Sequence, residues 1–193
     1  MENNRSFVDE ILTCWGIQGI DFDSYVNAYN SKNLIVDIFP FSVLDPEKFW
    51  QVEVFYGKLL DKTISPKCYF DYEGKYLRFI KFLWLYNVTD AFFDLNFDNY
   101  FRKGIKKHFK PKHPQASEEL HNVDSWLELE EFVTLALREA GYIFLHFKDW
   151  NLIVMINDFS MLVLCKEEKT TFVIKELAEK TGLFVRLCKN GTV

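Results

Sequence analysis

Residues 142–165, YIFLHFKDWNLIVMINDFSMLVLC, decide the fold of this chain. The stretch contains three runs of aliphatic, β-branched and aromatic residues, at 142–147, 151–156 and 160–165. The turn-forming pairs Lys148-Asp149 and Asn157-Asp158 separate these runs. Short apolar runs bounded by turn residues are typical of β-strands. We therefore predict three consecutive strands joined by tight turns.

The flanking segments predict helices and one more strand. Residues 125–141, SWLELEEFVTLALREAG, predict a helix with a Ser125–Glu128 capping box and Gly141 at its far end. Residues 167–182 predict a second helix, and 183–188, LFVRLC, a final strand. The core-facing residues expected in the second helix are Phe172, Ile174, Leu177 and Ala178.

The N-terminal half predicts a mixture of elements. We expect helices at 5–16 and 44–62, the latter begun by Asp45 and Pro46, and a strand at 33–39. Residues 67–87, KCYFDYEGKYLRFIKFLWLYN, predict a hairpin that turns at Glu73-Gly74. Residues 88–109 predict a further helix, because apolar residues recur there at three- and four-residue steps.

This order of elements predicts an α+β fold, with helices packed on one antiparallel or mixed sheet. The chain has 193 residues, including 20 Phe, 9 Tyr and 5 Trp, so we expect an aromatic-rich core. The length suits a single domain over 1–193. Pro111 and Pro114 leave open a division into subdomains 1–110 and 117–193, joined by a connection at 110–117.

Catalytic and metal-binding signatures are absent from the sequence. It contains no dinucleotide or phosphate-binding glycine loop, no HExxH and no GxSxG. The four cysteines lack zinc-ligand spacing. Three histidines, His108, His113 and His121, lie near one another in the sequence, but His108 and His113 are separated by a proline and do not have the spacing of a helical pair. We therefore expect no metal, no cofactor and no enzymatic activity.

The sequence also bears on cellular location. No run of about 18 or more apolar residues predicts a membrane span. The start, MENNRSFVDE, lacks the basic region of a signal peptide, and the scattered cysteines suit free thiols. These features favour the reducing cytoplasm and no membrane partner.

Acidic residues supply one set of candidate contacts for a protein partner. On the helix predicted at 88–109, Asp90, Asp94 and Asp98 recur at four-residue steps and form one stripe. Asp149, Trp150 and Asp158 lie in or beside the predicted strand turns. A solvated helix face and ordinary turns are the alternative interpretation.

One basic segment interrupts a chain whose net charge is −5. Residues 102–113, RKGIKKHFKPKH, hold six Lys or Arg and no acid, and the basic candidates are Arg102, Lys103, Lys106, Lys107 and Lys110. They stabilise a helix C-terminus, or dock an acidic surface such as that of a second copy in a homodimer. A third alternative is nucleic-acid binding, with Phe101 and Phe109 stacking on bases. The net-acidic flanks argue against nucleic acid.

In size, acidity, Asn/Lys/Phe/Ile-rich composition and the stretch FKDWNLIVMINDFSMLVLC, the chain resembles bacterial toxin-immunity proteins. The resemblance implies a non-catalytic inhibitor that binds a cognate toxin, expected to be basic and of the nuclease type. No motif carries it, so it assigns no residue a role. The alternative is an enzyme without a recognised motif, in which His146 acts with a carboxylate of the aspartate stripe.

Overall fold

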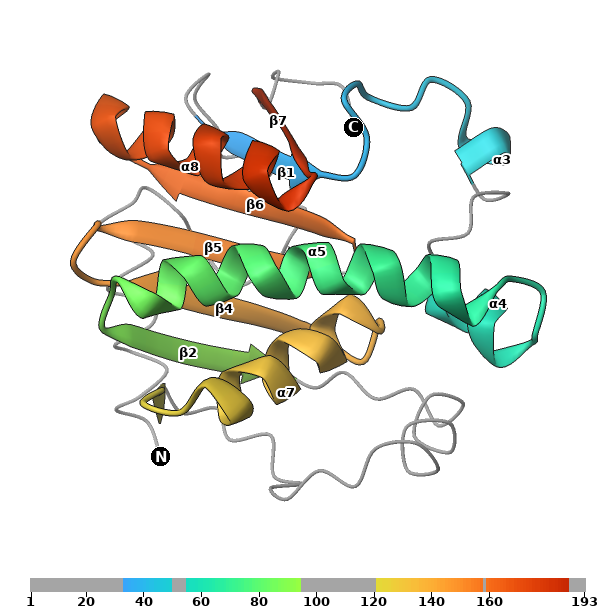
Figure 1. Ribbon diagram of the computed structural model, residues 1–193, viewed down its shortest axis with the longest axis horizontal. Helices are drawn as coiled ribbons and strands as arrows, with labels where there is room; N and C mark the ends of the chain where they lie inside the picture. Colours follow the sequence, from blue (N-terminus) through green and yellow to red (C-terminus); the bar gives the residue numbers. More distant parts are fainter. Residues whose placement is uncertain (1–32, 50–54, 95–120, 158, 188–193) are drawn as a thin grey trace.

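The structure is a computed structural model, and it describes residues 33–49, 55–94, 121–157 and 159–187. Helices and strands follow one another along the described chain (Figure 1). In order they are β1 (Leu34–Asp37), α3 (Pro46–Phe49), α4 (Tyr56–Leu60), α5 (Pro66–Leu85), β2 (Thr89–Asp94), β3 (His121–Asn122), α7 (Trp126–Leu137), β4 (Tyr142–Phe147), β5 (Leu152–Asn157), β6 (Ser160–Cys165), α8 (Glu168–Thr181) and β7 (Phe184–Leu187).

The described strands form one sheet in the order β3-β2-β4-β5-β6-β1-β7. Each pairing between them is antiparallel. The predicted strands β4, β5 and β6 are confirmed and lie side by side in the centre. The strands expected at 33–39 and 183–188 are also confirmed, as β1 and β7. Leu34 of β1 lies between Val163 of β6 and Leu187 of β7, so both halves of the chain contribute to the sheet.

Helices α5, α7 and α8 cover one face of this sheet (Figure 1). Side chains alternate along a strand, so Ile143, Leu145 and Phe147 of β4 all point toward the helices and are fully buried. From α5, the rings of Tyr69 and Tyr76 lie 5.0 and 5.3 Å from that of Phe159, centroid to centroid. The α+β class and the aromatic core are therefore confirmed.

The opposite face of the sheet is buried as well. Its side chains alternate with those that face the helices, and they include Phe144, Ile153, Met155, Leu162 and Leu164. A strand buried on both faces has no polar side to alternate with its apolar one. This explains why residues 142–165 read as nearly continuous apolar runs.

The hairpin predicted at 67–87 is wrong, because these residues form the 20-residue helix α5. Tyr69, Glu73, Tyr76, Ile80 and Leu83 recur at three- and four-residue steps and are all buried. That spacing places them on one helix face, which packs against the sheet. Pro66 occupies the first turn, where its missing N–H leaves no helical hydrogen bond unmade. The pattern of buried positions, rather than the β-propensity of Tyr, Phe and Ile, determines this element.

The helix predicted at 88–109 is also wrong over its first residues. Residues 89–94 form β2, which pairs with β4 so that Asp90 lies opposite His146 and Asp94 opposite Tyr142. Pairing with a buried strand stabilises the extended form against the local helical spacing. Residues 95–109, like the predicted helix at 5–16 and the connection at 110–117, lie outside the described residues, so the division into subdomains stays a prediction.

Two predicted helices have different boundaries in the structure. Asp45 caps α3 as expected, its Oδ1 accepting from the amides of Glu47 and Lys48 at 3.0 and 3.4 Å. However, Phe55 is extended at φ −92° and ψ 125°, so the helix predicted at 44–62 does not run through that residue. α7 ends at Leu137 instead of near Gly141, and Glu139 adopts a left-handed φ of 60° just beyond it.

Two details of the predicted helix faces are corrected. Ser125 precedes α7 but its side chain makes no capping hydrogen bond, so the predicted capping box does not form. On α8, Ile174 and Ala178 are buried as predicted, whereas Phe172 is exposed. None of the helices in the described part of the chain is long and apolar enough to cross a membrane.

Candidate functional site

An exposed apolar corner forms where α5 ends and β2 begins. Leu85, Tyr86 and Val88 are 55%, 63% and 51% exposed there. The Tyr86 ring stacks on Trp150 of the β4–β5 turn, with centroids 6.0 Å apart and planes 10° from parallel. We call Leu85, Tyr86, Val88, Asp149 and Trp150 the Tyr86–Trp150 corner. It joins segments more than 60 residues apart in the sequence into one surface.

Hydrogen bonds fix the backbone of this corner. The Asn87 side chain donates from Nδ2 to the Leu83 carbonyl at 2.8 Å and accepts from the Trp150 amide at 2.9 Å. The Val88 amide donates to Asp149 Oδ2 at 2.6 Å, and the Lys148 amide donates to the Val88 carbonyl at 3.0 Å. Contacts on both sides of the corner therefore fix the backbone that carries the two stacked rings.

A shallow hollow of about 280 Å³ adjoins the corner on the side of the helices. Trp84, Leu85 and Val88 line one wall, and Val123 and Asp124 line the other. The indole of Trp84 donates from Nε1 to the Val123 carbonyl at 3.0 Å, which fixes the distance between the walls. The hollow extends the apolar surface beyond the two stacked rings.

A polar cluster lies in the strands that carry the corner. Asp90 is buried, and its Oδ2 forms an ion pair with Lys148 Nζ at 2.7 Å. Asn122 of β3 donates from Nδ2 to Asp90 Oδ1 at 3.4 Å. The ion pair ties β2 to the turn that carries Asp149 and Trp150. Asp90 is therefore a structural residue, and its predicted place on an exposed acidic stripe is wrong.

His146 lies directly across the strands from Asp90. Its Nδ1 is buried and has no hydrogen-bond partner among the described residues. Burial lowers the pKa of His146, the Asp90 carboxylate raises it in part, and the nearby Lys148 lowers it further. The strand register thus brings together a histidine and an aspartate, the two residue types that the enzyme hypothesis requires. No hydrogen bond through His146 Nδ1 joins them.

The predicted contact residues have different outcomes. Asp149 and Trp150 both lie in the Tyr86–Trp150 corner, which the structure brings together with residues of α5. Asp94 lies in β2, whereas Asp98 and Asp158 are outside the described residues. The basic candidates Arg102, Lys103, Lys106, Lys107 and Lys110 are outside them too, so their roles stay predictions.

Sequence reasoning missed Leu85, Tyr86 and Val88 as surface residues. In a hairpin at 67–87, side chains alternate between two faces, and both faces carry apolar residues. That alternation does not distinguish exposed apolar residues from buried ones. On a helix the buried stripe runs through Tyr76, Ile80 and Leu83, and Leu85 falls about 200° from Leu83. Correct helical phasing is the signal that would have found an apolar residue off the buried face.

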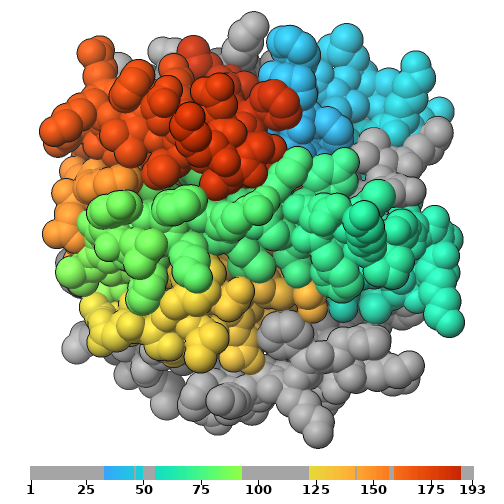
Figure 2. Space-filling view, viewed as in Figure 1, coloured from blue at the N-terminus to red at the C-terminus, as the bar shows by residue number. Residues whose placement is uncertain are grey.

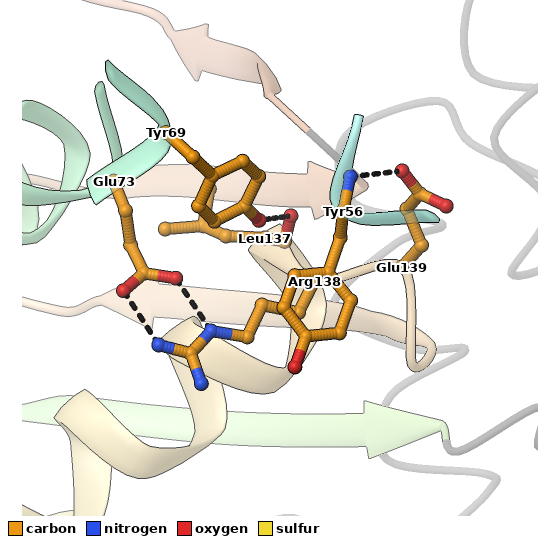
Figure 3. A network of polar contacts seen from close by, with 6 residues as sticks. All are labelled: Tyr56, Tyr69, Glu73, Leu137, Arg138 and Glu139. Carbon is orange, nitrogen blue, oxygen red and sulfur yellow. Dashed lines mark hydrogen bonds and ion pairs between the residues drawn. The ribbon is translucent and has the colours of Figure 1, made fainter. Parts of the chain in front are cut away.

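A second polar network joins α4, α5 and α7 (Figure 3). Arg138 bridges to Glu73, and its guanidinium also lies 5.5 Å from the centroid of the Tyr56 ring. The Tyr69 hydroxyl donates to the Leu137 carbonyl at 3.1 Å, and the Tyr56 amide donates to Glu139 Oε1 at 3.1 Å. Burial raises the pKa of Glu139, and the amide hydrogen bond opposes that rise. Each contact ties α4 or α5 to the last residue of α7 or to the two residues that follow it, so the network has a structural role.

The chain matches no known family model, no curated protein and no solved structure. Within the described part of the chain, no three His, Cys, Asp or Glu side chains are grouped as metal ligands.

Proposed function

We propose that this protein is a non-catalytic inhibitor of the immunity type, which binds a toxin protein through the Tyr86–Trp150 corner. The observation that carries the proposal is the exposed Tyr86 ring stacked on Trp150 between the exposed side chains of Leu85 and Val88. Tyr and Trp are the residues most enriched among the energetic anchors of protein interfaces.

The geometry of the corner favours binding without reorganisation. A tyrosine side chain has few rotatable bonds, and this one already rests on a second ring. The amide hydrogen bonds to Asn87 and Asp149 hold the backbone on both sides. A surface ordered in advance loses little conformational entropy when a partner binds.

Charge supports a basic partner. Asp149 lies in the corner and Asp124 on the wall of the adjoining hollow, and both side chains are exposed. The chain as a whole has a net charge of −5. Acidic surfaces speed association with basic proteins, and nucleases are basic because they bind phosphates. These features support the role of a cytoplasmic inhibitor that binds a nuclease toxin.

Co-expression with the product of the neighbouring gene tests this function. The two proteins should co-purify as a complex at physiological salt, and the complex should suppress nuclease activity of the partner. A neighbouring product that elutes separately and remains equally active would contradict the proposal.

A second candidate function rests on the cross-strand placement of His146 and Asp90. In this alternative, neutral His146 acts as a general base in hydrolysis. The test compares turnover of ester and phosphodiester substrates by the wild type and by His146→Ala. Turnover that disappears in the variant, while its thermal unfolding is unchanged, would favour the enzyme over the inhibitor.

A further inference from the structure

Helices α5 and α7 lie side by side on the outside of the molecule (Figure 2), and they run in roughly opposite directions (Figure 1). Tyr69 contacts Leu137 at one end of their seam, and Trp84 contacts Val123 at the other. Between these contacts lies an open groove of about 360 Å³. Phe70, Gly74 and Leu77 of α5 and Trp126 of α7 form its apolar lining. We call this surface the α5–α7 seam.

The two walls of the seam carry opposite charges over the middle of the groove. Arg78 and Lys81 line it from α5, and Glu130 lines it from α7. Arg78 and Glu130 form no ion pair with any described residue, and Lys81 lies 5.1 Å from the centroid of the Trp126 ring. Asp71 adds one acid nearer the start of α5. Two exposed basic residues on α5 therefore lie across the groove from the partly exposed Glu130 on α7.

Apolar side chains accompany these charges. Leu127 on α7 is 76% exposed, and Phe70 on α5 is also exposed. Trp126, the neighbour of Leu127 in the sequence, is half-buried and tilts against Trp84, with centroids 6.0 Å apart. Large exposed apolar side chains beside a groove are a common feature of surfaces that bind another protein.

We propose that the α5–α7 seam is the interface of a homodimer. A twofold axis parallel to the two helices and lying along the seam places α5 of each copy over α7 of the other. Arg78 and Lys81 of one copy then face Glu130 of the second copy, and the same contact occurs twice. Such an interface must be self-complementary, and a basic pair on α5 beside an acidic residue on α7 meets that condition.

This inference is independent of the proposed toxin binding. The Tyr86–Trp150 corner lies at the C-terminal end of α5, whereas the groove lies in the middle of that helix. Variants at Arg78 and Glu130 therefore test the dimer, and variants at Tyr86 test the inhibitor. Either claim can fail without the other.

Sedimentation velocity of the full chain at low salt tests the dimer. The wild type should sediment as a dimer that weakens as salt is raised, because salt screens exposed charge pairs. Arg78→Glu alone and Glu130→Arg alone each place like charges opposite one another, and each should raise the dissociation constant by about tenfold or more. The double variant, Arg78→Glu with Glu130→Arg, restores opposite charges and should recover most of the affinity.

Lys169→Glu and Lys175→Glu on α8 are matched controls, because they reverse exposed charges on a different helix. These two variants should dimerise like the wild type. A wild type that is monomeric at all accessible concentrations would overturn the inference. So would a dimer that survives Arg78→Glu, or single variants that dissociate with no recovery in the double variant.

Discussion

Arg138, the residue that follows α7, holds Glu73 of α5 through two parallel bonds, Nε to Oε2 at 2.6 Å and Nη2 to Oε1 at 2.8 Å (Figure 3). The two side chains are only 13% and 8% exposed. Planar guanidinium and carboxylate groups match in this geometry, which adds direction to the charge attraction. The pair fixes how two of the sheet-covering helices pack. Its two residues lie 65 positions apart in the sequence.

Glu73→Gln should lower the free energy of unfolding by about 3 kcal/mol, because it leaves the buried Arg138 charge without its partner. Urea denaturation at neutral pH measures the change. Glu176→Gln on the exposed face of α8 is the control, and its effect should stay within about 0.5 kcal/mol. Replacing both partners, as Glu73→Leu with Arg138→Met, should recover much of the loss. Equal effects of Glu73→Gln and Glu176→Gln would show that the pair is not buried.

Gly74→Ala should raise the free energy of unfolding by about 0.5–1 kcal/mol, because alanine loses less backbone entropy inside a helix. A Cβ at this position meets no atom within 4 Å, so no clash opposes the gain. Thermal or urea unfolding measures it. If 67–87 were the hairpin that β-propensity suggests, alanine in the turn at Glu73-Gly74 would destabilise the protein. The sign of the effect therefore separates the two structures.

The central strands and the fold class could be predicted because their signals are local. Residues 142–165 combine apolar runs with turn pairs, and nothing elsewhere in the chain competes with that pattern. α5 could not be recognised by composition, because its Tyr, Phe, Ile and Trp residues favour strands in isolation. Its helical phasing becomes decisive only when Tyr69, Tyr76 and Leu83 have a sheet to cover. Residues 89–94 form the strand β2, because pairing with β4 stabilises the extended backbone more than the helical spacing of the aspartates favours a helix.

The candidate site was predictable only in part for a similar reason. Asp149 and Trp150 lie in a turn that the sequence marks clearly, so the sequence predicts both as candidate contact residues. Their partner Tyr86 directly follows α5, whose residues predict a strand hairpin from the sequence alone. Contacts such as Tyr86–Trp150 and Glu73–Arg138 join distant segments, and a single sequence carries no signal of that proximity.

The stability of the protein should depend on His146 in mildly acidic solution. Burial lowers the pKa of His146 below its ordinary value of 6.5, so the unfolded chain binds a proton that the folded chain does not. Stability is therefore lost as pH falls below 6.5 toward the lowered pKa, and it is fully present above 6.5. Asp90 and Lys148 face the ring and modulate this effect.

Urea unfolding of the wild type and of His146→Gln between about pH 5 and 8 measures this dependence. The difference in unfolding free energy, wild type minus variant, should shrink as the pH falls, because glutamine does not titrate. Titrating carboxylates elsewhere are shared by both proteins and cancel in the difference. A difference that stays constant over the whole range would mean that His146 titrates alike in the folded and unfolded chains.

The affinity of Tyr86→Ala for the product of the neighbouring gene is the most direct test of the proposed inhibitor. Truncating the ring removes an anchor stacked on Trp150, and we expect a loss of about 2 kcal/mol, or about thirtyfold in the dissociation constant. Phe172→Ala on α8 is the matched control, since Phe172 is as exposed as Tyr86 but lies away from the corner. Calorimetric titration should give weakened binding for Tyr86→Ala and wild-type binding for Phe172→Ala. Binding by Tyr86→Ala that equals the wild type would contradict the account.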